Sequence, residues 1–194
     1  MSTQMLALES GEAKSDPNLA TFGVLCAAAA VLMAFGALFA AWLSLRAGSS
    51  VWPPKGVGLE NYYGTTLTLT MAMGVMAVEW ASYAVRRGEK GQAVSAYLLV
   101  VVLGLAFINL LTYVVRGAHF GPGTHAYGAV YYAFNVLMTA TVAVAIVFSL
   151  IALARFLGGQ VSDREPAMAR SAAWFWHTAT LGWLVMYTAV YVVK

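Results

Sequence analysis

The sequence predicts an all-α integral membrane protein with five transmembrane helices. Hydrophobic residues make up 61% of the 194 residues, charged residues only 10%, and the mean hydropathy is +0.74. A soluble domain of this size would need a far more polar surface. Four long stretches carry no charge and a fifth carries one, and each exceeds the roughly 20 residues that a helix needs to cross a bilayer. The predicted spans are 19–45, 62–85, 93–115, 126–154 and 171–193.

Residues 1–18 form the predicted N-terminal tail, and the first span follows it. The tail carries three carboxylates and one lysine, and it lacks the basic start and short apolar core of a secretory signal. We therefore expect the first span to be retained. Within this span, small residues recur four positions apart, as in Gly36 with Ala40 and Ala37 with Ala41. Such faces let membrane helices approach one another closely.

Proline and glycine separate the remaining spans. Proline has no N–H to donate and is well placed just before a helix begins. All five prolines lie outside the spans, each shortly before one: Pro17, Pro53, Pro54, Pro122 and Pro166. The gap at 86–92, "RRGEKGQ", uses glycine and charge instead. It predicts a tight hairpin turn between the antiparallel second and third spans.

The basic residues predict the orientation in the membrane. With five spans, the N-terminal tail and the second and fourth loops share one side, and they carry seven basic residues against four on the other side. The positive-inside rule then places the N-terminus in the cytoplasm and the C-terminus outside. The net charge of +3 fits this asymmetry and gives no support for nucleic-acid binding, which would need a basic face outside the membrane.

The titratable residues predict no catalytic, cofactor or metal site in this chain. His119 and His125 lie in an outer loop, and only His177 lies within a span. A membrane haem held by two imidazoles needs histidines at matching depth on different helices. A copper or zinc centre needs three or four converging ligands. His119 and His125 could at most form a weak surface metal site, and we favour solvated loop residues.

Glu79 is the only carboxylate within a span, and two arrangements are open for it. It lies about six residues from the cytoplasmic end of its span, and His177 lies at a similar depth of roughly 9 Å in the last span. A lone carboxylate there is costly unless it is paired or reaches water. Glu79 either bonds His177 and joins the two spans, or it extends towards Arg86 and Arg87 while His177 bonds a backbone carbonyl.

Two asparagines are the other polar residues deep in the spans. Asn109 lies about six residues from the outer end of the third span, and Asn135 about nine from the outer start of the fourth. Their depths differ by only a few ångströms, which predicts an interhelical amide hydrogen bond worth about 0.6–2 kcal/mol. This contact would be structural.

Aromatic residues near the ends of the spans predict an interfacial belt, because their amphipathic rings favour the membrane surface. On the outer side these are Trp52, Tyr62, Tyr63, Tyr127, Tyr131 and Tyr132, and on the cytoplasmic side Trp174 and Trp176.

Four segments together resemble the third subunit of haem-copper oxidases, the cytochrome c and quinol oxidase family. "WPPKGV" at 52–57 resembles its W-P-P-x-G segment, "WASYAVRRG" at 80–88 its W-A-x-x-x-x-x-x-G turn, and "AYGAVYYA" at 126–133 its Y-G-S-x-F-F helix start. "WFWHTATLGWLVMY" at 174–187 resembles its W-Y-W-H-F-x-D-x-x-W-x-x-x-Y helix. The resemblance covers 19–194, and five spans match the short bacterial form of this subunit. The signature residues are Trp52, Pro53, Pro54, Gly56, Trp80, Tyr127, Gly128, Trp174, Trp176, His177 and Trp183.

The sequence departs from the family at four polar positions. Ala30 replaces a buried glutamate, Met138 and Thr141 replace two histidines, and Thr180 replaces an aspartate. The family associates those groups with proton collection and bundle polarity, so the chain looks like a divergent member without that antenna.

The resemblance implies a non-catalytic accessory subunit, a subunit III-like helix bundle in the bacterial cytoplasmic membrane. The haems and copper are then expected in partner subunits, with direct contact to the haem-bearing subunit I and a complex that includes the copper-bearing subunit II. No cofactor is expected on this chain itself, apart from structural phospholipids in a cleft. Three alternatives remain open: an accessory subunit of a nitric oxide reductase-type complex, a small independent transporter, and a purely structural membrane protein of another complex.

Overall fold

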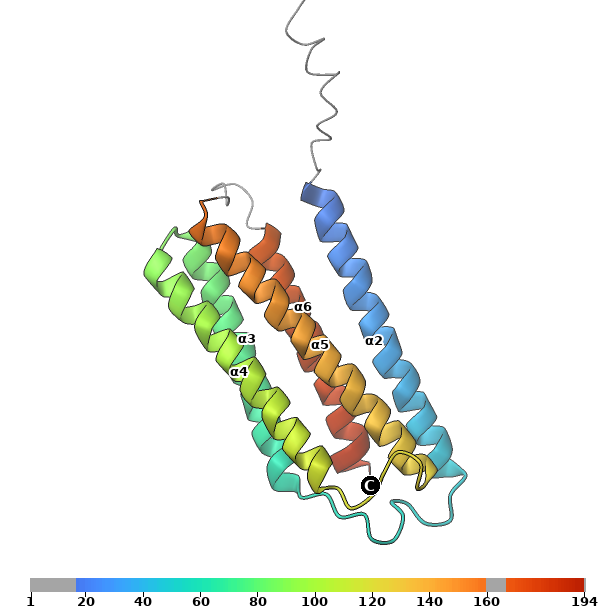
Figure 1. Ribbon diagram of the computed structural model, residues 1–194. Coiled ribbons are helices and arrows are strands. Elements are labelled where there is room, and N and C mark those ends of the chain that lie inside the picture. The colour runs from blue at the N-terminus through green and yellow to red at the C-terminus, as the bar shows by residue number, and fades with distance from the viewer. Residues whose placement is uncertain (1–16, 160–166, 194) are drawn as a thin grey trace, which may run out of the picture.

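The computed structural model describes residues 17–159 and 167–193, and five long helices lie side by side in this part of the chain (Figure 1). None of the described residues forms a strand, so the predicted all-α fold is confirmed. The helices are α2 (Pro17–Ala47), α3 (Asn61–Arg86), α4 (Lys90–Gly117), α5 (Ala126–Leu157) and α6 (Ala167–Tyr187), and α6 continues into the π-helix η1 (Thr188–Val192).

The helices match the predicted spans but extend past most of their ends. The second span, predicted at 62–85, becomes Asn61–Arg86, and the third, predicted at 93–115, becomes Lys90–Gly117. The helices include charged residues such as Arg86 and Lys90, because a helix need not end where the hydrocarbon layer of the membrane ends. Most of the predicted tail, residues 1–16, lies outside the described residues.

Three of the five helices are long and apolar enough to cross a membrane by length and composition. These are Thr21–Ala47 of α2, Lys90–Gly117 and Ala126–Leu157. Helices α3 and α6 lie alongside them, but glycines, hydroxyl groups and indoles lower their hydropathy. The coarse prediction of a multi-pass membrane protein is therefore supported, with three candidate spans in the described part of the chain.

The predicted hairpin between the second and third spans is confirmed. Helix α3 ends at Arg86 and α4 begins at Lys90. Gly88 in the turn has a φ of +69°, a backbone conformation that glycine adopts at no steric cost. The side chain of Trp80 crosses the hairpin, and its indole N–H donates to the Gln92 side-chain oxygen at 3.1 Å.

Helix α6 occupies the middle of the bundle. It packs on α2, α3 and α5, whereas α3 and α4 form an antiparallel pair at one side (Figure 1). The start of α2, the α3–α4 turn and the start of α6 share one end of the bundle. The segments 48–60 and 118–125 and the end of η1 share the other. This arrangement agrees with the predicted alternation of the loops.

Helix α2 lies at the edge and leaves most of its surface uncovered by this chain. In the most apolar 18-residue stretch of α2, only 11% is buried inside the protein. Phe35 and Trp42 are fully buried against the bundle, and Phe35 fits against Gly182 of α6, where a Cβ would collide with its ring. The small residues of the first span face outward instead: Gly36, Ala37, Ala40 and Ala41 are all exposed.

Candidate functional site

Trp176 of α6 fills the centre of the bundle and contacts three other helices. Its side chain is fully buried. The ring lies against Gly74 of α3 and Gly104 of α4, where added Cβ atoms would lie 2.8 and 3.3 Å from its carbons. Its indole N–H donates to the Ser149 hydroxyl of α5 at 3.2 Å. The prediction that Trp176 belongs to an interfacial belt is therefore wrong, because the two glycines open an internal slot for its ring.

Trp183 makes the second polar contact of α6. Its side chain is fully buried, and its indole N–H donates to the Thr68 hydroxyl of α3 at 2.9 Å. Thr68 in turn donates to the Gly64 carbonyl at 2.8 Å, so its single proton and one lone pair are both used. The Trp183 ring meets Phe107 of α4 edge-on, with centroids 5.2 Å apart.

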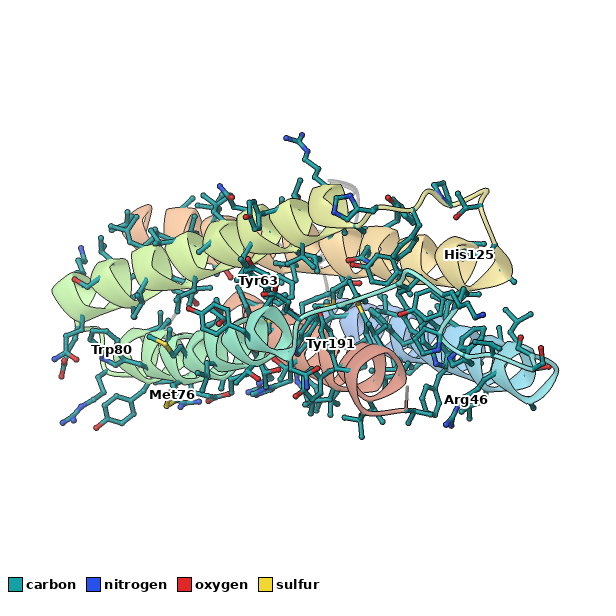
Figure 2. All side chains as sticks on the ribbon, turned by 90° about the horizontal axis from the view of Figure 1, so that it is seen from below. Arg46, Tyr63, Met76, Trp80, His125 and Tyr191 are labelled. Carbon is teal, nitrogen blue, oxygen red and sulfur yellow. The ribbon has the colours of Figure 1, made fainter. Side chains whose placement is uncertain are left out.

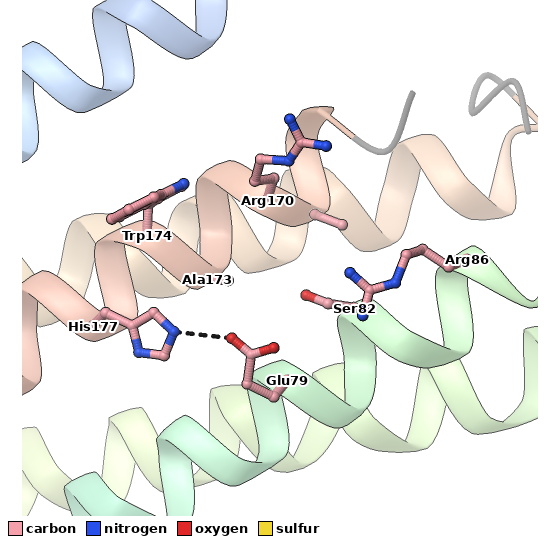
Figure 3. Close-up of a pocket in the computed structure, with 8 residues that line it drawn as sticks. Glu79, Ser82, Arg86, Arg170, Ala173, Trp174 and His177 are labelled. Atoms are coloured by element: carbon pink, nitrogen blue, oxygen red, sulfur yellow. Dashed lines mark hydrogen bonds and ion pairs between the residues drawn. The ribbon is translucent and has the colours of Figure 1, made fainter. Parts of the chain in front are cut away.

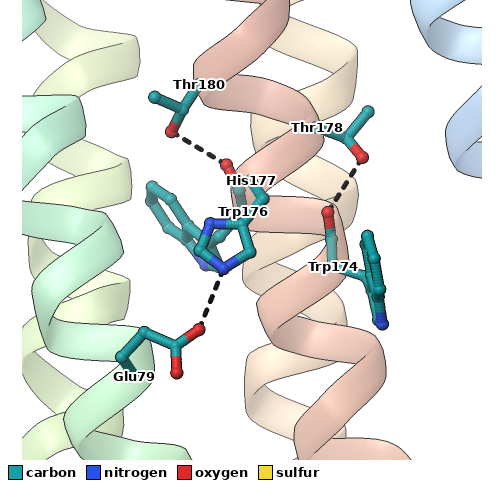
Figure 4. A network of polar contacts seen from close by, with 6 residues as sticks. All are labelled: Glu79, Trp174, Trp176, His177, Thr178 and Thr180. Atoms are coloured by element: carbon teal, nitrogen blue, oxygen red, sulfur yellow. Dashed lines mark hydrogen bonds and ion pairs between the residues drawn. The ribbon is translucent and has the colours of Figure 1, made fainter.

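Glu79 and His177 make the third contact, and the sharper of the two sequence hypotheses is confirmed. His177 Nε2 and Glu79 Oε1 lie 2.9 Å apart, a hydrogen bond between α6 and α3 (Figure 4). The side chains remain 39% and 50% exposed, so the pair lies at the surface of the bundle. Helix α6 is thus joined to α5 by one side-chain hydrogen bond, from Trp176, and to α3 by two, from His177 and Trp183.

Ser149 and Thr68, the partners of the two indoles, were missed in the sequence. Each is a single hydroxyl residue among many in apolar helices, and each also bonds a carbonyl of its own helix, which is ordinary for membrane segments. Their depth in the bundle could have identified them, because the indole N–H of a buried tryptophan needs a hydrogen-bond acceptor at its own depth.

The tryptophan of "WPPKGV" packs into the protein rather than anchoring at the membrane surface. The Trp52 ring centroid lies 5.0 Å from that of Trp42 and 5.1 Å from that of Tyr127. The prediction of an outer belt is wrong for Tyr127 and Tyr131, which are 3% and 1% exposed. Tyr127 lies against Trp42 and Trp52, and Phe120 of the segment 118–125 lies against both tyrosines. Tyr62 is 72% exposed and does face outward.

The backbone of this linker explains one more signature position, Gly56. The bond between Trp52 and Pro53 is cis, and Pro54 accepts a hydrogen bond from the Val57 N–H at 3.2 Å. Gly56 has a φ of +89°, which a residue with a Cβ rarely adopts. The glycine of W-P-P-x-G therefore serves the turn itself.

His125 caps a helix and is not a lone loop residue. Its Nδ1 accepts the Gly128 N–H at 2.8 Å at the start of α5, at the end of the bundle seen in Figure 2. Gly128 must lack a side chain because a Cβ would lie 2.5 Å from the Gly121 carbonyl oxygen. His119 is exposed. Among the described residues, no group of three or more His, Cys, Asp or Glu side chains could hold a metal ion.

The predicted bond between Asn109 and Asn135 is wrong. Asn109 is exposed, because Phe107 and Leu111 on either side of it point into the bundle. Asn135 is buried, and its Nδ2 donates to the Tyr131 carbonyl of its own helix at 2.7 Å, while its Oδ1 has no partner. The two residues lie at the same depth, but Asn109 is on an exposed face of its helix and Asn135 on a buried one.

The four positions that depart from the family carry no polar contact between helices in the described part of the chain. Ala30 is exposed on α2, and Met138 is fully buried in α5. Thr141 donates to the Leu137 carbonyl of its own helix at 2.8 Å. Thr180 donates to the Trp176 carbonyl of its own helix at 2.9 Å (Figure 4).

These observations define a class: a helical membrane protein in which two buried indoles, Trp176 and Trp183, donate hydrogen bonds to hydroxyl groups of neighbouring helices. The model of the family "Cytochrome c oxidase subunit III" matches residues 20–194. The chain therefore belongs to the cytochrome c oxidase subunit III family. It is 30% identical to cytochrome c oxidase subunit 3 of Anopheles gambiae over 143 residues, 72% of this chain and 54% of that protein. It is 27% identical to the Paracentrotus lividus protein over 142 residues, 72% and 54% of the two chains. The chain thus spans about half the length of these relatives.

Proposed function

We propose that this chain is a non-catalytic accessory subunit of a respiratory cytochrome c oxidase in a bacterial cytoplasmic membrane. The single observation that carries the proposal is the family match over 20–194, within which the signature side chains Trp176, His177 and Trp183 each form a hydrogen bond to another helix. Partner subunits would hold the haems and copper and reduce oxygen. This chain would bind no cofactor and would stabilise the haem-bearing subunit together with phospholipids.

All five helices cross the membrane in this proposal, including α3 and α6. Helix α3 has 26 residues, enough for about 39 Å at 1.5 Å per residue. Its low hydropathy is partly due to threonines, but their hydroxyls donate to carbonyls four residues earlier, which hides their polarity from lipid. These residues are Thr65, Thr66, Thr68 and Thr70.

The proposed orientation has the N-terminus in the cytoplasm and follows from the basic residues at the two ends of the bundle. One end carries Arg86, Arg87, Lys90, Arg155 and Arg170, and the other carries Arg46, Lys55 and Arg116.

Cysteine labelling tests this orientation. A Lys55→Cys variant in a Cys26→Ser background should react with a membrane-impermeant maleimide in intact spheroplasts. An Arg87→Cys variant in the same background should react only after lysis. The reverse pattern would contradict the orientation, and labelling of both positions from one side would contradict the crossing of the membrane by α3, the helix between them.

The outward face of α2 is where we place the haem-bearing partner. This helix is mostly uncovered, and its exposed small residues would let a partner helix approach closely. Cys26, the one cysteine of the sequence, is exposed on the same helix. A short photoactivatable cross-linker on Cys26 should therefore capture the partner subunit.

Copurification tests the assignment as a whole. A chain tagged after residue 194 is extracted in a mild detergent, and the partners are identified by mass spectrometry and haem spectroscopy. We expect a haem-bearing subunit and oxygen consumption by the complex. Copurification with nitric oxide reduction instead of oxygen consumption, or substrate uptake by the chain alone in liposomes, would support the first two alternatives and contradict the proposal.

A further inference from the structure

One face of α4 carries seven exposed residues with the spacing of a coiled-coil seam. They recur at alternating intervals of three and four residues, so they fill the a and d positions of a heptad repeat. The a positions are Ser95, Val102, Asn109 and Arg116, and the d positions are Leu98, Leu105 and Thr112. Helices in membranes pack mostly in the left-handed geometry that this spacing favours. We call these seven residues the α4 seam.

The α4 seam is left uncovered by the described part of the chain. Leu98, Val102 and Leu105 are 52%, 59% and 56% exposed. Helix α4 lies at the opposite side of the bundle from α2 (Figure 1). A partner on the seam would therefore not compete with a partner subunit on α2.

Asn109 places an amide on this seam within the hydrocarbon layer. Helix α4 has 28 residues, about 42 Å, and exceeds a hydrocarbon layer of about 30 Å by roughly 6 Å at each end. Asn109 lies eight residues before Gly117, where α4 ends, so its Cα is about 6 Å inside this layer. A short amide side chain cannot reach water from there as a lysine can.

The Asn109 amide has no hydrogen-bond partner among the described residues. Two N–H donors and a carbonyl oxygen are therefore left without a partner where lipid offers none. The other exposed polar side chain at such a depth, Glu79, is bonded to His177 beside the pocket in Figure 3. A polar residue within a membrane helix is costly unless it is paired, so Asn109 requires a partner from outside this chain.

The seam favours a second copy of this chain as that partner. Two copies inserted in the same direction hold Asn109 at the same depth. An amide both donates and accepts, so two asparagines that face each other across a two-fold axis satisfy one another. The flanking residues agree, because a β-branched residue at a with leucine at d favours parallel two-stranded packing, and Val102 lies between Leu98 and Leu105.

Helix α3 also exposes an apolar stripe, but that stripe requires no protein partner. It includes Leu69, Met73 and Met76, which are 61%, 49% and 65% exposed. Lipid chains cover such side chains as well as another helix does. The two helices differ in the amide of Asn109, and Met76 therefore provides a matched control.

We propose that the protein forms a two-fold symmetric dimer in the membrane through the α4 seam, with the two Asn109 side chains hydrogen-bonded to each other. Each Nδ2 donates to the Oδ1 of the other copy. Thr112 and Arg116 of the seam also line a groove between α4 and α5 with a cavity volume of about 470 Å³, which side chains of the second copy can enter. The dimer does not depend on the oxidase assignment, because the seam lies away from α2.

Cysteine cross-linking of the full chain in the membranes of expressing cells tests whether the seam pairs with itself. In a Cys26→Ser background, Leu98→Cys and Leu105→Cys should each form a disulfide-linked dimer on mild oxidation. Equivalent d positions face each other across a two-fold seam and come within reach of a disulfide. Leu99→Cys, exposed beside the seam, and Met76→Cys on α3 should form much less dimer.

Energy transfer between donor- and acceptor-labelled full chains in liposomes measures the contribution of Asn109. One hydrogen bond between membrane helices changes an association constant about threefold on average. Asn109→Leu removes two such bonds from the dimer and should weaken association roughly eightfold. It also makes α4 more apolar, so insertion is not impaired. Asn109→Gln keeps the amide and should keep most of the association, and Met76→Leu should leave it unchanged.

Four results would overturn the inference. They are an absence of self-association at the highest protein density in the liposomes, equal cross-linking of Leu98→Cys and Leu99→Cys, wild-type association of Asn109→Leu, and capture of a different protein by benzoylphenylalanine placed at Val102. The last would indicate a partner subunit on the seam instead of a second copy. None of these results affects the copurification test, because that test identifies haem-bearing partners and is independent of the dimer.

Discussion

A substitution at Gly74 tests whether Trp176 joins the helices as described. The Cβ of alanine at this position would lie 2.8 Å from Trp176 Cζ3, whereas carbon atoms favour about 3.5–4.0 Å. The ring must therefore move by roughly 1 Å. It cannot move freely, because its N–H is bonded to Ser149 and its other edge meets Gly104.

The expected cost of Gly74→Ala follows from comparison with a matched glycine. Overpacking a filled core costs about 1–3 kcal/mol. Alanine also gains about 0.5–1 kcal/mol over glycine in a helix, which offsets part of the loss. Gly36→Ala on α2 carries the same gain without the collision, because nothing lies within 4 Å of its added Cβ. The difference between the two variants should therefore equal the overpacking term, about 1–3 kcal/mol.

The measurement is the free energy of unfolding of the purified chain in mixed micelles, titrated with sodium dodecyl sulfate. Gly74→Ala should unfold at a lower mole fraction of this detergent, and Gly36→Ala at the wild-type fraction or above it. Trp176→Phe should cost less in the Gly74→Ala background than in the wild type, because a smaller ring relieves the collision. A difference below about 0.5 kcal/mol between the two alanine variants would refute the slot for Trp176.

Three further contacts can be tested, two in the same assay and one by limited proteolysis. A double-mutant cycle of Glu79→Ala and His177→Ala should give a coupling of about 0.6 kcal/mol, the average for hydrogen bonds between membrane helices, and at most about 1.7 kcal/mol; additive single effects would contradict the pair. Thr68→Val should leave the Trp183 indole without a partner and cost about 1–3 kcal/mol, whereas Thr112→Val, whose hydroxyl is exposed, should cost less than half as much. Gly128→Ala should destabilise the start of α5 and raise proteolysis of the loop before it, because its Cβ would collide with a loop carbonyl 2.5 Å away, and an unchanged digestion pattern would argue against this close approach.

Much of the architecture could be predicted because it depends on each segment separately. The absence of charge over more than 20 residues marks a membrane helix whatever surrounds it. Glycine and charge alone predicted the hairpin at positions 86–92. Depth and cost put the bond between Glu79 and His177 forward as one of two arrangements, and the structure decided between them. Depth is simply the distance along a helix from its end, so it can be counted in the sequence.

The sequence by itself therefore determined the helices, their order and the levels of their polar residues. Only the tertiary structure decided which face of each helix is covered. A membrane helix is apolar towards lipid and towards its neighbours alike, so the periodicity that orients a soluble helix is weak here. Asn109 and Asn135 share a level but face different surroundings, and Trp176 and Tyr127 are buried where a belt was predicted. The burial of Trp176 depends on glycines of other helices, Gly74 and Gly104, whose missing side chains make room for its ring only once the helices have packed.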